Sequence, residues 1–257
     1  MVRGIEIYKE YFSDYSDHYV IIGGTACDII MNNIDADFRA TKDFDVVLIA
    51  EAFSEDFFRK LWQFISDGGY KNKQRSSGKE QFYRFTIPQD GRFPVMIELF
   101  SREPFDFNLK EGSALTPIPV GEDIPSLSAI LLDKVYYNLL SEGSVIIDGV
   151  SVLSKECLIL YKIKAWLDLR DRKEIGEHID SKNIKKHKND VFKLLSIVSP
   201  TKRIAVNETI IIDIDKFLEL VKNEPVVMKD IGITVIDFSR ALRMIGEIYI
   251  EKDKSIS

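Results

Sequence analysis

The sequence predicts an α/β (α+β) protein, with a mixed β-sheet and helices in an N-terminal domain and a mostly α-helical C-terminal domain. Up to Leu153, short apolar runs bounded by glycine or proline alternate with segments of helical periodicity. From Ser154 onward, apolar residues recur at helical spacing. We therefore expect one domain over residues 1–153 and a second over residues 154–257.

The first elements form a strand, a glycine turn, a helix and a second strand. After a helix expected over Ile5–Ser16, a short apolar strand, Tyr19–Ile22, ends at the Gly-Gly-Thr turn Gly23–Thr25. A helical segment and a polar loop lead into a strand over Asp43–Ile49, which begins Asp-Phe-Asp. Glycines after a strand let the backbone approach a phosphate, and the next helix offers free N–H groups to it.

Two further strands and a capped helix follow in this domain. Ser54 is a good N-cap for a helix over Glu55–Asp67. The basic segment Lys71–Lys79 is expected to be a loop and is the first candidate for contact with phosphate or RNA. Strands are expected over Gln81–Ile87 and Pro94–Phe100, joined by a turn that contains proline and glycine.

The rest of the chain is expected to be mainly helical. The segment Arg102–Asp123 is rich in proline and glycine and is expected to be a loop, and Ser126–Leu140 has helical spacing. Val145–Leu153 is expected to be a strand or a small hairpin that turns at Asp148-Gly149. The helices expected in the second domain are Glu156–Arg172, Asn183–Val198, Asp213–Asn223 and Val235–Ile250.

Two carboxylates stand where the second strand begins. Side chains alternate along a strand, so Asp43 and Asp45 project to the same side, about 7 Å apart. Their negative charges repel each other, and a divalent cation with oxygen ligands would relieve that repulsion. The glycine turn and these two carboxylates together predict a nucleotide site.

Composition excludes several classes of protein. The net charge of -6 gives no general attraction to nucleic acid, so any such contact must come from a local patch. The 2 cysteines are too few for a disulfide framework or a zinc site. No stretch reaches the length of a membrane span, and the N-terminus lacks an apolar signal region. A cytoplasmic protein is expected.

A Gly-Gly-Thr turn followed by an Asp-x-Asp strand resembles the nucleotidyltransferase fold of the DNA polymerase β superfamily. The longer gap here, between Gly-Gly-Thr-Ala and Thr-Lys-Asp-Phe-Asp, is most similar to the AbiEii (abortive infection, type IV toxin) branch. That resemblance implies metal-dependent transfer of NMP from an NTP to an acceptor, with Mg²⁺ (or Mn²⁺) as cofactor. It also implies RNA as acceptor, a toxin–antitoxin or phage-defence role, and an antitoxin partner protein.

The resemblance assigns roles in the first domain. It implies that Asp43, Asp45 and Glu98 hold the metal, with Glu98 as the third carboxylate in the middle of the predicted strand VMIELF. The family more often has Asp there, and an edge-strand Glu that faces water is the alternative. Gly23, Gly24 and Thr25 would cradle the triphosphate through backbone N–H groups and the threonine hydroxyl.

The second domain adds a weaker match. Lys162 matches the lysine of the family's Lys-x-x-Ala helix, and Asp190 matches an aspartate that ends a basic stretch. One acidic position of that stretch is replaced by His187. Lys162 would bind the triphosphate. The alternatives are a snorkelling lysine and a solvated aspartate.

A basic patch near Asp190 is the expected contact for an RNA acceptor, through Lys185, Lys186 and Lys188. A solvated helix face would explain the same lysines. The rival to an enzyme is a non-catalytic nucleotide- or RNA-binding module, or an antitoxin partner, on the same fold. Such a module would not need all three carboxylates, so Glu98 is the residue that distinguishes the two.

Overall fold

The computed structural model describes residues 2–52, 54–74, 80–100, 130–131 and 133–252. The chain divides into two compact units, which we describe separately. The first comprises Met1–Ile124 and Glu142–Ser154, and the second comprises Pro125–Ser141 and Lys155–Ser257. The segment Pro125–Ser141 thus groups with the helical unit, where the Tyr161 hydroxyl donates a hydrogen bond to the Tyr136 carbonyl over 2.8 Å.

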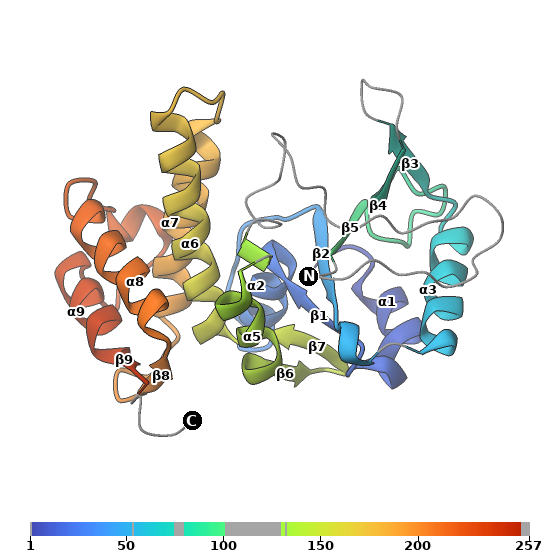
Figure 1. Ribbon diagram of the computed structural model, residues 1–257, viewed down its shortest axis with the longest axis horizontal. Coiled ribbons are helices and arrows are strands. Elements are labelled where there is room, and N and C mark those ends of the chain that lie inside the picture. The colour runs from blue at the N-terminus through green and yellow to red at the C-terminus, as the bar shows by residue number, and fades with distance from the viewer. Residues whose placement is uncertain (1, 53, 75–79, 101–129, 132, 253–257) are drawn as a thin grey trace. The chain divides into compact units, whose positions relative to one another are not determined.

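The described part of the first unit holds a seven-stranded mixed sheet in the order β3-β4-β5-β2-β1-β7-β6 (Figure 1). Strand β1 is antiparallel to β2 and parallel to β7, while β2 is parallel to β5. Strand β5 is in turn antiparallel to β4. The strands are β1 Tyr19–Ile22, β2 Asp43–Leu48, β3 Lys71–Gln74, β4 Glu80–Thr86, β5 Met96–Phe100, β6 Ser144–Ile147 and β7 Val150–Leu153.

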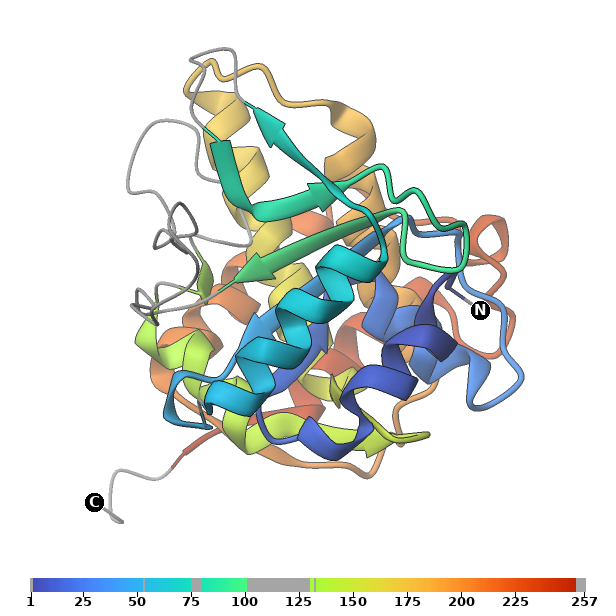
Figure 2. The ribbon, with the colours of Figure 1, turned by 90° about the vertical axis from the view of Figure 1, so that its right-hand side faces the viewer.

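Helices α1 (Ile5–Phe12) and α3 (Glu55–Asp67) lie side by side on the sheet (Figure 2). Aromatic rings fill the space beneath them: the Tyr8 ring lies 4.8 Å from Phe44 of β2 and 5.7 Å from Phe64 of α3. Burial of such large rings contributes much of the stabilisation of a core. The Phe44 side of β2 therefore belongs to the hydrophobic core.

Local patterns predicted several elements correctly. The Ser54 hydroxyl accepts a hydrogen bond from the Phe57 N–H over 3.2 Å, so the predicted cap of α3 is confirmed. Strands β6 and β7 form a hairpin, which was one of the two alternatives expected there, with φ of 50° at Asp148 and 80° at Gly149. Helix α2 (Gly23–Asn32) begins at the glycine turn. Short 3₁₀ turns at Ser13–Tyr15 and Ala50–Ala52 complete the described helical segments of this unit.

One prediction in this unit was wrong. The start of the basic segment expected to be a loop, Lys71–Gln74, forms β3 and pairs antiparallel with β4. Backbone pairing with a neighbouring strand overrides the polar composition of this segment. The remainder of that segment and the expected loop Arg102–Asp123 lie outside the described residues.

The second unit is mostly helical, but it also contains a small parallel sheet that the sequence did not predict. Strands β8 (Ile204–Val206) and β9 (Tyr249–Glu251) pair with each other, so the last helix ends before Tyr249. Asn207 caps the next helix by accepting the Thr209 N–H over 2.9 Å, which starts that helix earlier than expected. The helices are α5 Lys134–Gly143, α6 Lys155–Glu174, α7 Ser181–Leu195, α8 Glu208–Val221 and α9 Phe238–Ile248, with a 3₁₀ turn at Met228–Ile231.

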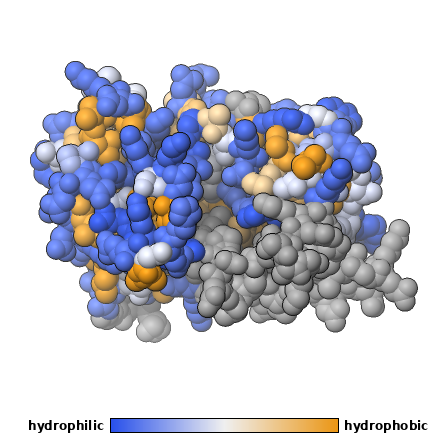
Figure 3. Space-filling view, turned by 90° about the horizontal axis from the view of Figure 1, so that it is seen from above, coloured by the Kyte–Doolittle hydropathy of each residue, from blue (hydrophilic) through white to orange (hydrophobic). Residues whose placement is uncertain are grey.

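The face of the molecule in Figure 3 shows mainly hydrophilic side chains, with apolar ones in separate patches. Within the described residues, no helix is both long enough and apolar enough to cross a bilayer.

Candidate functional site

Strand β2 separates the hydrophobic core from a polar face of the sheet. Successive side chains of a strand point to opposite faces, so Asp43 and Asp45 project away from the face that carries Phe44. Phe44 is fully buried, Asp45 is buried with 9% of its surface exposed, and Asp43 is half-buried. Two of the predicted site residues therefore lie on one face at the start of β2.

Glu98 lies directly beside Asp45. Strands β2 and β5 are parallel neighbours, and their register pairs Asp45 with Glu98. Residues paired in this way project to the same face of a sheet. Strand β5 lies between β2 and β4, and the Glu98 side chain is 14% exposed, so the alternative of an edge-strand glutamate facing water is wrong.

The same row continues to an arginine that sequence analysis missed. The register of β4 and β5 pairs Arg84 with Glu98, and the Arg84 guanidinium forms an ion pair with the Glu98 carboxylate. The Nε of Arg84 is buried and makes no hydrogen bond within the described residues. The signal in the sequence that could have identified it was an arginine between two aromatic residues, Tyr83 and Phe85.

The glycine turn lies in close contact with the row of charged side chains formed by Asp45, Glu98 and Arg84. Gly23 has φ of 68°, and a Cβ atom at this position would overlap the Asp45 carboxylate. A Cβ on Gly24 would lie 2.6 Å from the Thr41 hydroxyl oxygen and 3.6 Å from an Arg39 guanidinium nitrogen. Only glycine fits this close approach of the turn to β2 and to the loop before it.

Thr25 ties helix α2 to strand β2. It is fully buried, and its hydroxyl donates a hydrogen bond to the Asp43 carbonyl oxygen over 2.6 Å. The hydroxyl proton is therefore used within the chain itself, which fixes the start of α2 beside the start of β2. The first turn of α2 has no side-chain cap, since Ile22 occupies the N-cap position. Its N–H groups are suited to an anion.

The chemistry of these donors fits a hard divalent cation, while their positions fit it only in part. Asp43, Asp45 and Glu98 supply the carboxylate oxygens that Mg²⁺ prefers. Within the described residues, however, no three acidic, histidine or cysteine side chains are gathered as a metal would require. The Glu98 carboxylate is instead held in an ion pair with Arg84 of β4.

Lys162 and Asp190 are brought together within the second unit. The Lys162 Nζ lies 3.1 Å from an Asp190 carboxylate oxygen, and the two side chains are only 5% and 1% exposed. Helices α6 and α7 supply one partner each. The alternatives of a snorkelling lysine and a solvated aspartate are both wrong, because the residues form a buried ion pair between two helices.

A second pair in this unit is less buried. The Lys164 Nζ lies 2.8 Å from an Asp213 carboxylate oxygen, which also accepts a hydrogen bond from the Tyr136 hydroxyl over 2.8 Å. Burial, together with the charge of Asp213, raises the pKa of Tyr136 well above its ordinary value. Lys164 thus links helix α6 to helix α8 through Asp213.

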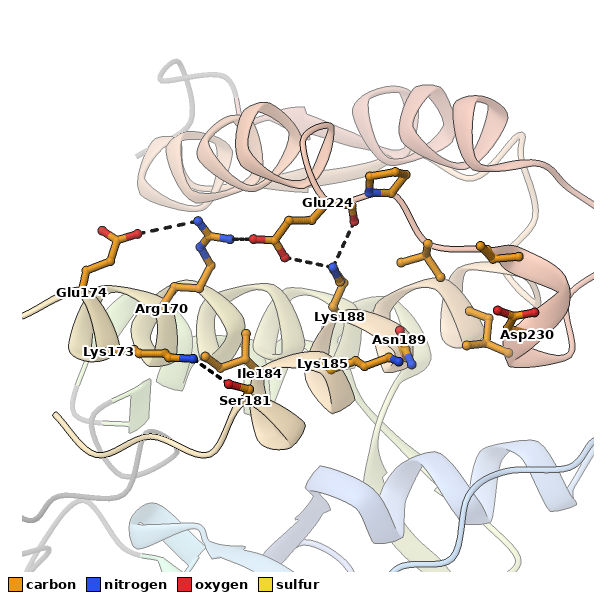
Figure 4. A pocket seen from close by; sticks show the side chains of 14 residues that line it. Arg170, Lys173, Glu174, Ser181, Ile184, Lys185, Lys188, Asn189, Glu224 and Asp230 are labelled. Carbon is orange, nitrogen blue, oxygen red and sulfur yellow. Dashed lines mark hydrogen bonds and ion pairs between the residues drawn. The ribbon is translucent and has the colours of Figure 1, made fainter. Parts of the chain in front are cut away.

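The predicted basic patch is not a uniform surface. Lys185 is exposed and Lys186 half-buried, but Lys188 is buried, with its Nζ 3.0 Å from a Glu224 carboxylate oxygen and 3.0 Å from the Glu224 carbonyl (Figure 4). Arg170 forms an ion pair with the same carboxylate. Burial raises the pKa of Glu224, but the two cations more than offset this and leave the pKa lowered.

These residues line a pocket of about 750 Å³ within the helical unit (Figure 4). Its walls mix basic, acidic and apolar side chains, so they do not present the basic surface that RNA phosphates require. The lining residues are Arg170, Lys173, Glu174, Ser181, Ile184, Lys185, Lys188, Asn189, Glu224, Pro225, Val226, Val227, Asp230 and Ile231.

Comparison with known proteins gives little. No family model matches the chain, and no curated protein matches it. Among solved structures, a match is found to the antibiotic-resistance factor ANT(2'')-Ia, whose solution structure reveals substrate-regulated conformation dynamics. That match has 14% sequence identity and a TM-score of 0.32, and it covers 73% of this chain and 82% of the other. A likeness at this level carries no argument about fold or activity.

Proposed function

We propose that this protein is a metal-dependent nucleotidyltransferase that transfers NMP from an NTP to an acceptor. The observation that carries the proposal is the pairing of Asp45 with Glu98 on neighbouring parallel strands, beside a glycine turn at the start of α2. Carboxylates for a cation and an uncapped helix start for a phosphate thus lie within one short stretch of the sheet.

Each residue has a defined part in this proposal. Asp43 and Asp45 would hold Mg²⁺, with Glu98 as the third carboxylate. When bound, such ions stabilise the charge that develops on the attacking and leaving oxygens of an in-line displacement. Gly23 and Gly24 allow the phosphates to approach the backbone, and the first N–H groups of α2 donate to them.

Sequence analysis did not identify Arg39. Its guanidinium lies near Gly24 at the start of α2, where a positive charge favours a bound phosphate.

Lys162 and Asp190 have a different role in this proposal. Their mutual burial supports a structural role in the helical unit, so we assign no step of the transfer to them.

The finer assignment rests on the sequence motifs alone. The Gly-Gly-Thr and Asp-x-Asp motifs extend the proposal to an AbiEii-like toxin with RNA as acceptor and an antitoxin as partner. Of the predicted RNA contacts, Lys185 keeps its place in the proposal because it is exposed. Lys188 does not, since it is bound to Glu224. The transfer site itself is assigned to the predicted domain over residues 1–153.

One observation favours the rival function of a non-catalytic binding module. Glu98 is bound to Arg84, and the described carboxylates are not gathered for a metal. A module that only binds nucleotide would tolerate this arrangement. An enzyme must have an arrangement in which Glu98 faces Asp45.

Incubation of the protein with each α-labelled NTP, Mg²⁺ and total RNA tests the proposal. We expect label to enter RNA with the wild type and to be lost with Asp45→Asn. The matched control is Asp56→Asn, because Asp56 is an exposed residue of α3 in the same unit, with 70% of its side chain accessible. Absence of transfer with every NTP would refute the enzyme. Equal transfer by Asp45→Asn would refute the site.

A further inference from the structure

We propose that Arg84 is a functional residue of this site, because it is the counter-ion that a divalent cation must displace from Glu98. The inference rests on the proposed function for its site but makes a separate claim. It assigns to Arg84 the control of metal affinity, and it predicts that removal of this arginine tightens metal binding.

The geometry begins with a row of three charged side chains across neighbouring strands. Asp45, Glu98 and Arg84 occupy paired positions on β2, β5 and β4, so they project to one face of the sheet. Neighbouring strands lie about 4.8 Å apart, which places the two carboxylates within reach of each other. Like charges in such positions destabilise a sheet, and Arg84 offsets this at the Glu98 end of the row.

A cation and Arg84 compete for the same carboxylate. The arginine binds Glu98 through a terminal guanidinium nitrogen, and it neutralises the charge that would attract a cation to the space beside Asp45. The side chains of the pair are 23% and 14% exposed, so water and ions reach them. Because solvent still reaches the pair, a doubly charged ion can compete with Arg84 for the Glu98 carboxylate.

Once displaced, Arg84 still needs an acceptor. Its Nε is already buried without a hydrogen bond within the described residues, and loss of Glu98 would leave a terminal nitrogen without its present partner as well. A planar guanidinium suits phosphate oxygens, which a nucleotide brings to the same site. Metal and nucleotide should therefore bind cooperatively, and each should favour the other through Arg84.

Mn²⁺ titration, followed by the electron paramagnetic resonance signal of the free ion, tests the inference without any turnover. We expect Arg84→Gln to bind Mn²⁺ about five- to tenfold more tightly than the wild type in the absence of nucleotide, at the low end of couplings between sites. In a Glu98→Gln background, Arg84→Gln should change nothing. Arg84→Lys keeps the charge and should lie between the two.

The matched control is Arg92→Gln. Arg92 belongs to the same unit and forms an ion pair with Asp90 at 2.7 Å, but its side chain is 74% exposed and it lies outside β4. This variant should bind Mn²⁺ as the wild type does. Circular dichroism confirms folding, and Arg84→Met serves as a second neutral variant if Arg84→Gln fails to fold.

The outcomes separate the two proposals. Tighter Mn²⁺ binding by Arg84→Gln without any NMP transfer would support the role of Arg84 and refute the enzyme. NMP transfer with unchanged or weaker Mn²⁺ binding by Arg84→Gln would refute the role of Arg84 alone. Absence of Mn²⁺ binding in both proteins would overturn the inference.

Discussion

The pairs Arg84–Glu98 and Lys162–Asp190 are built alike, yet their surroundings differ. Each joins neighbouring elements, β4 to β5 in the first unit and α6 to α7 in the second. The side chains of the first pair are 23% and 14% exposed, whereas those of the second are 5% and 1% exposed. Exposure determines whether a charge can change partners. A partly exposed pair can yield to a ligand, while a buried pair cannot release either charge without leaving the other unsolvated.

This difference separates residues that the sequence motifs had grouped together. Glu98 and Lys162 were both expected to act on one bound nucleotide. Glu98 lies on a face of the sheet that also carries Asp45 and the glycine turn. Lys162 is buried within the helical unit and is bound to Asp190. A motif match identifies a residue type and its spacing, but burial decides which chemistry is open to it.

The largest effect is expected from breaking the buried pair. Asp190→Ala should lower the free energy of unfolding by about 3–5 kcal/mol, because it leaves the Lys162 charge buried without its partner. Urea denaturation followed by circular dichroism measures this. The double variant Lys162→Met with Asp190→Leu should recover most of the loss, since two apolar residues replace both charges. A loss below about 1 kcal/mol would contradict a buried pair.

A smaller loss is expected where the glycine turn meets Asp45. Gly23→Ala should cost about 1–3 kcal/mol, because Gly23 has a positive φ and a Cβ there overlaps the Asp45 carboxylate. Gly91→Ala is the control, since a Cβ at Gly91 meets only an Arg3 nitrogen at 3.6 Å. Both variants are compared by urea denaturation. Equal stability of the two would show that the turn does not press against Asp45.

The partly exposed pair should contribute far less to stability than the buried pair. Arg84→Gln should change the free energy of unfolding by about 0–1 kcal/mol, in contrast to Asp190→Ala. The same urea titration measures both variants, so their difference is free of systematic error. If Arg84→Gln cost as much as Asp190→Ala, the two pairs would be alike and the comparison would fail.

The smallest effect concerns Glu224, whose carboxylate is also paired but more exposed. Its pKa in the folded protein is lowered from the ordinary value of 4.5, because Lys188 and Arg170 outweigh the effect of burial. A lowered pKa contributes stability above the unfolded value, and this contribution is lost as the pH falls through the folded value. The melting temperature of the wild type should therefore exceed that of Glu224→Gln at pH 7.

This difference in melting temperature should shrink below about pH 4.5, the ordinary pKa of a glutamate. Thermal melts of both proteins at a series of pH values measure it. A constant difference across the acidic range would show that the ionised carboxylate is not the source of the stability.

Local signals in the sequence predicted the parts of the fold that depend on neighbouring residues. The cap at Ser54, the hairpin turn at Asp148 and the strand–turn–helix around Gly23 all follow from residue types within a few positions. Strand β3 was missed because its sequence, Lys-Asn-Lys-Gln, has no apolar alternation, although it pairs with β4, the next strand along the chain. Strands β8 and β9 were missed because 3 residues each carry too little pattern.

In the candidate site, too, the features set by neighbouring residues were predicted, and those set by the pairing of separate elements were not. Asp43 and Asp45 were placed on one side of a strand by alternation alone. The ion pair of Arg84 was not predictable, because it depends on β5 lying between β2 and β4 and on the register of both pairings. The pairing of Lys162 with Asp190 likewise requires α6 to pack on α7, which no local pattern specifies.

The pairing of β1 with β7 has a consequence for synthesis of the chain on the ribosome. Ile21 pairs with Val152, so the sheet that carries the site is completed by a hairpin made long after its first strand. Contacts between such distant segments slow folding, since a long loop must close before they stabilise anything. Until Leu153 has left the ribosome, the edge of β1 that β7 will cover stays open. Truncation before the hairpin should therefore yield an aggregation-prone fragment instead of a smaller stable domain.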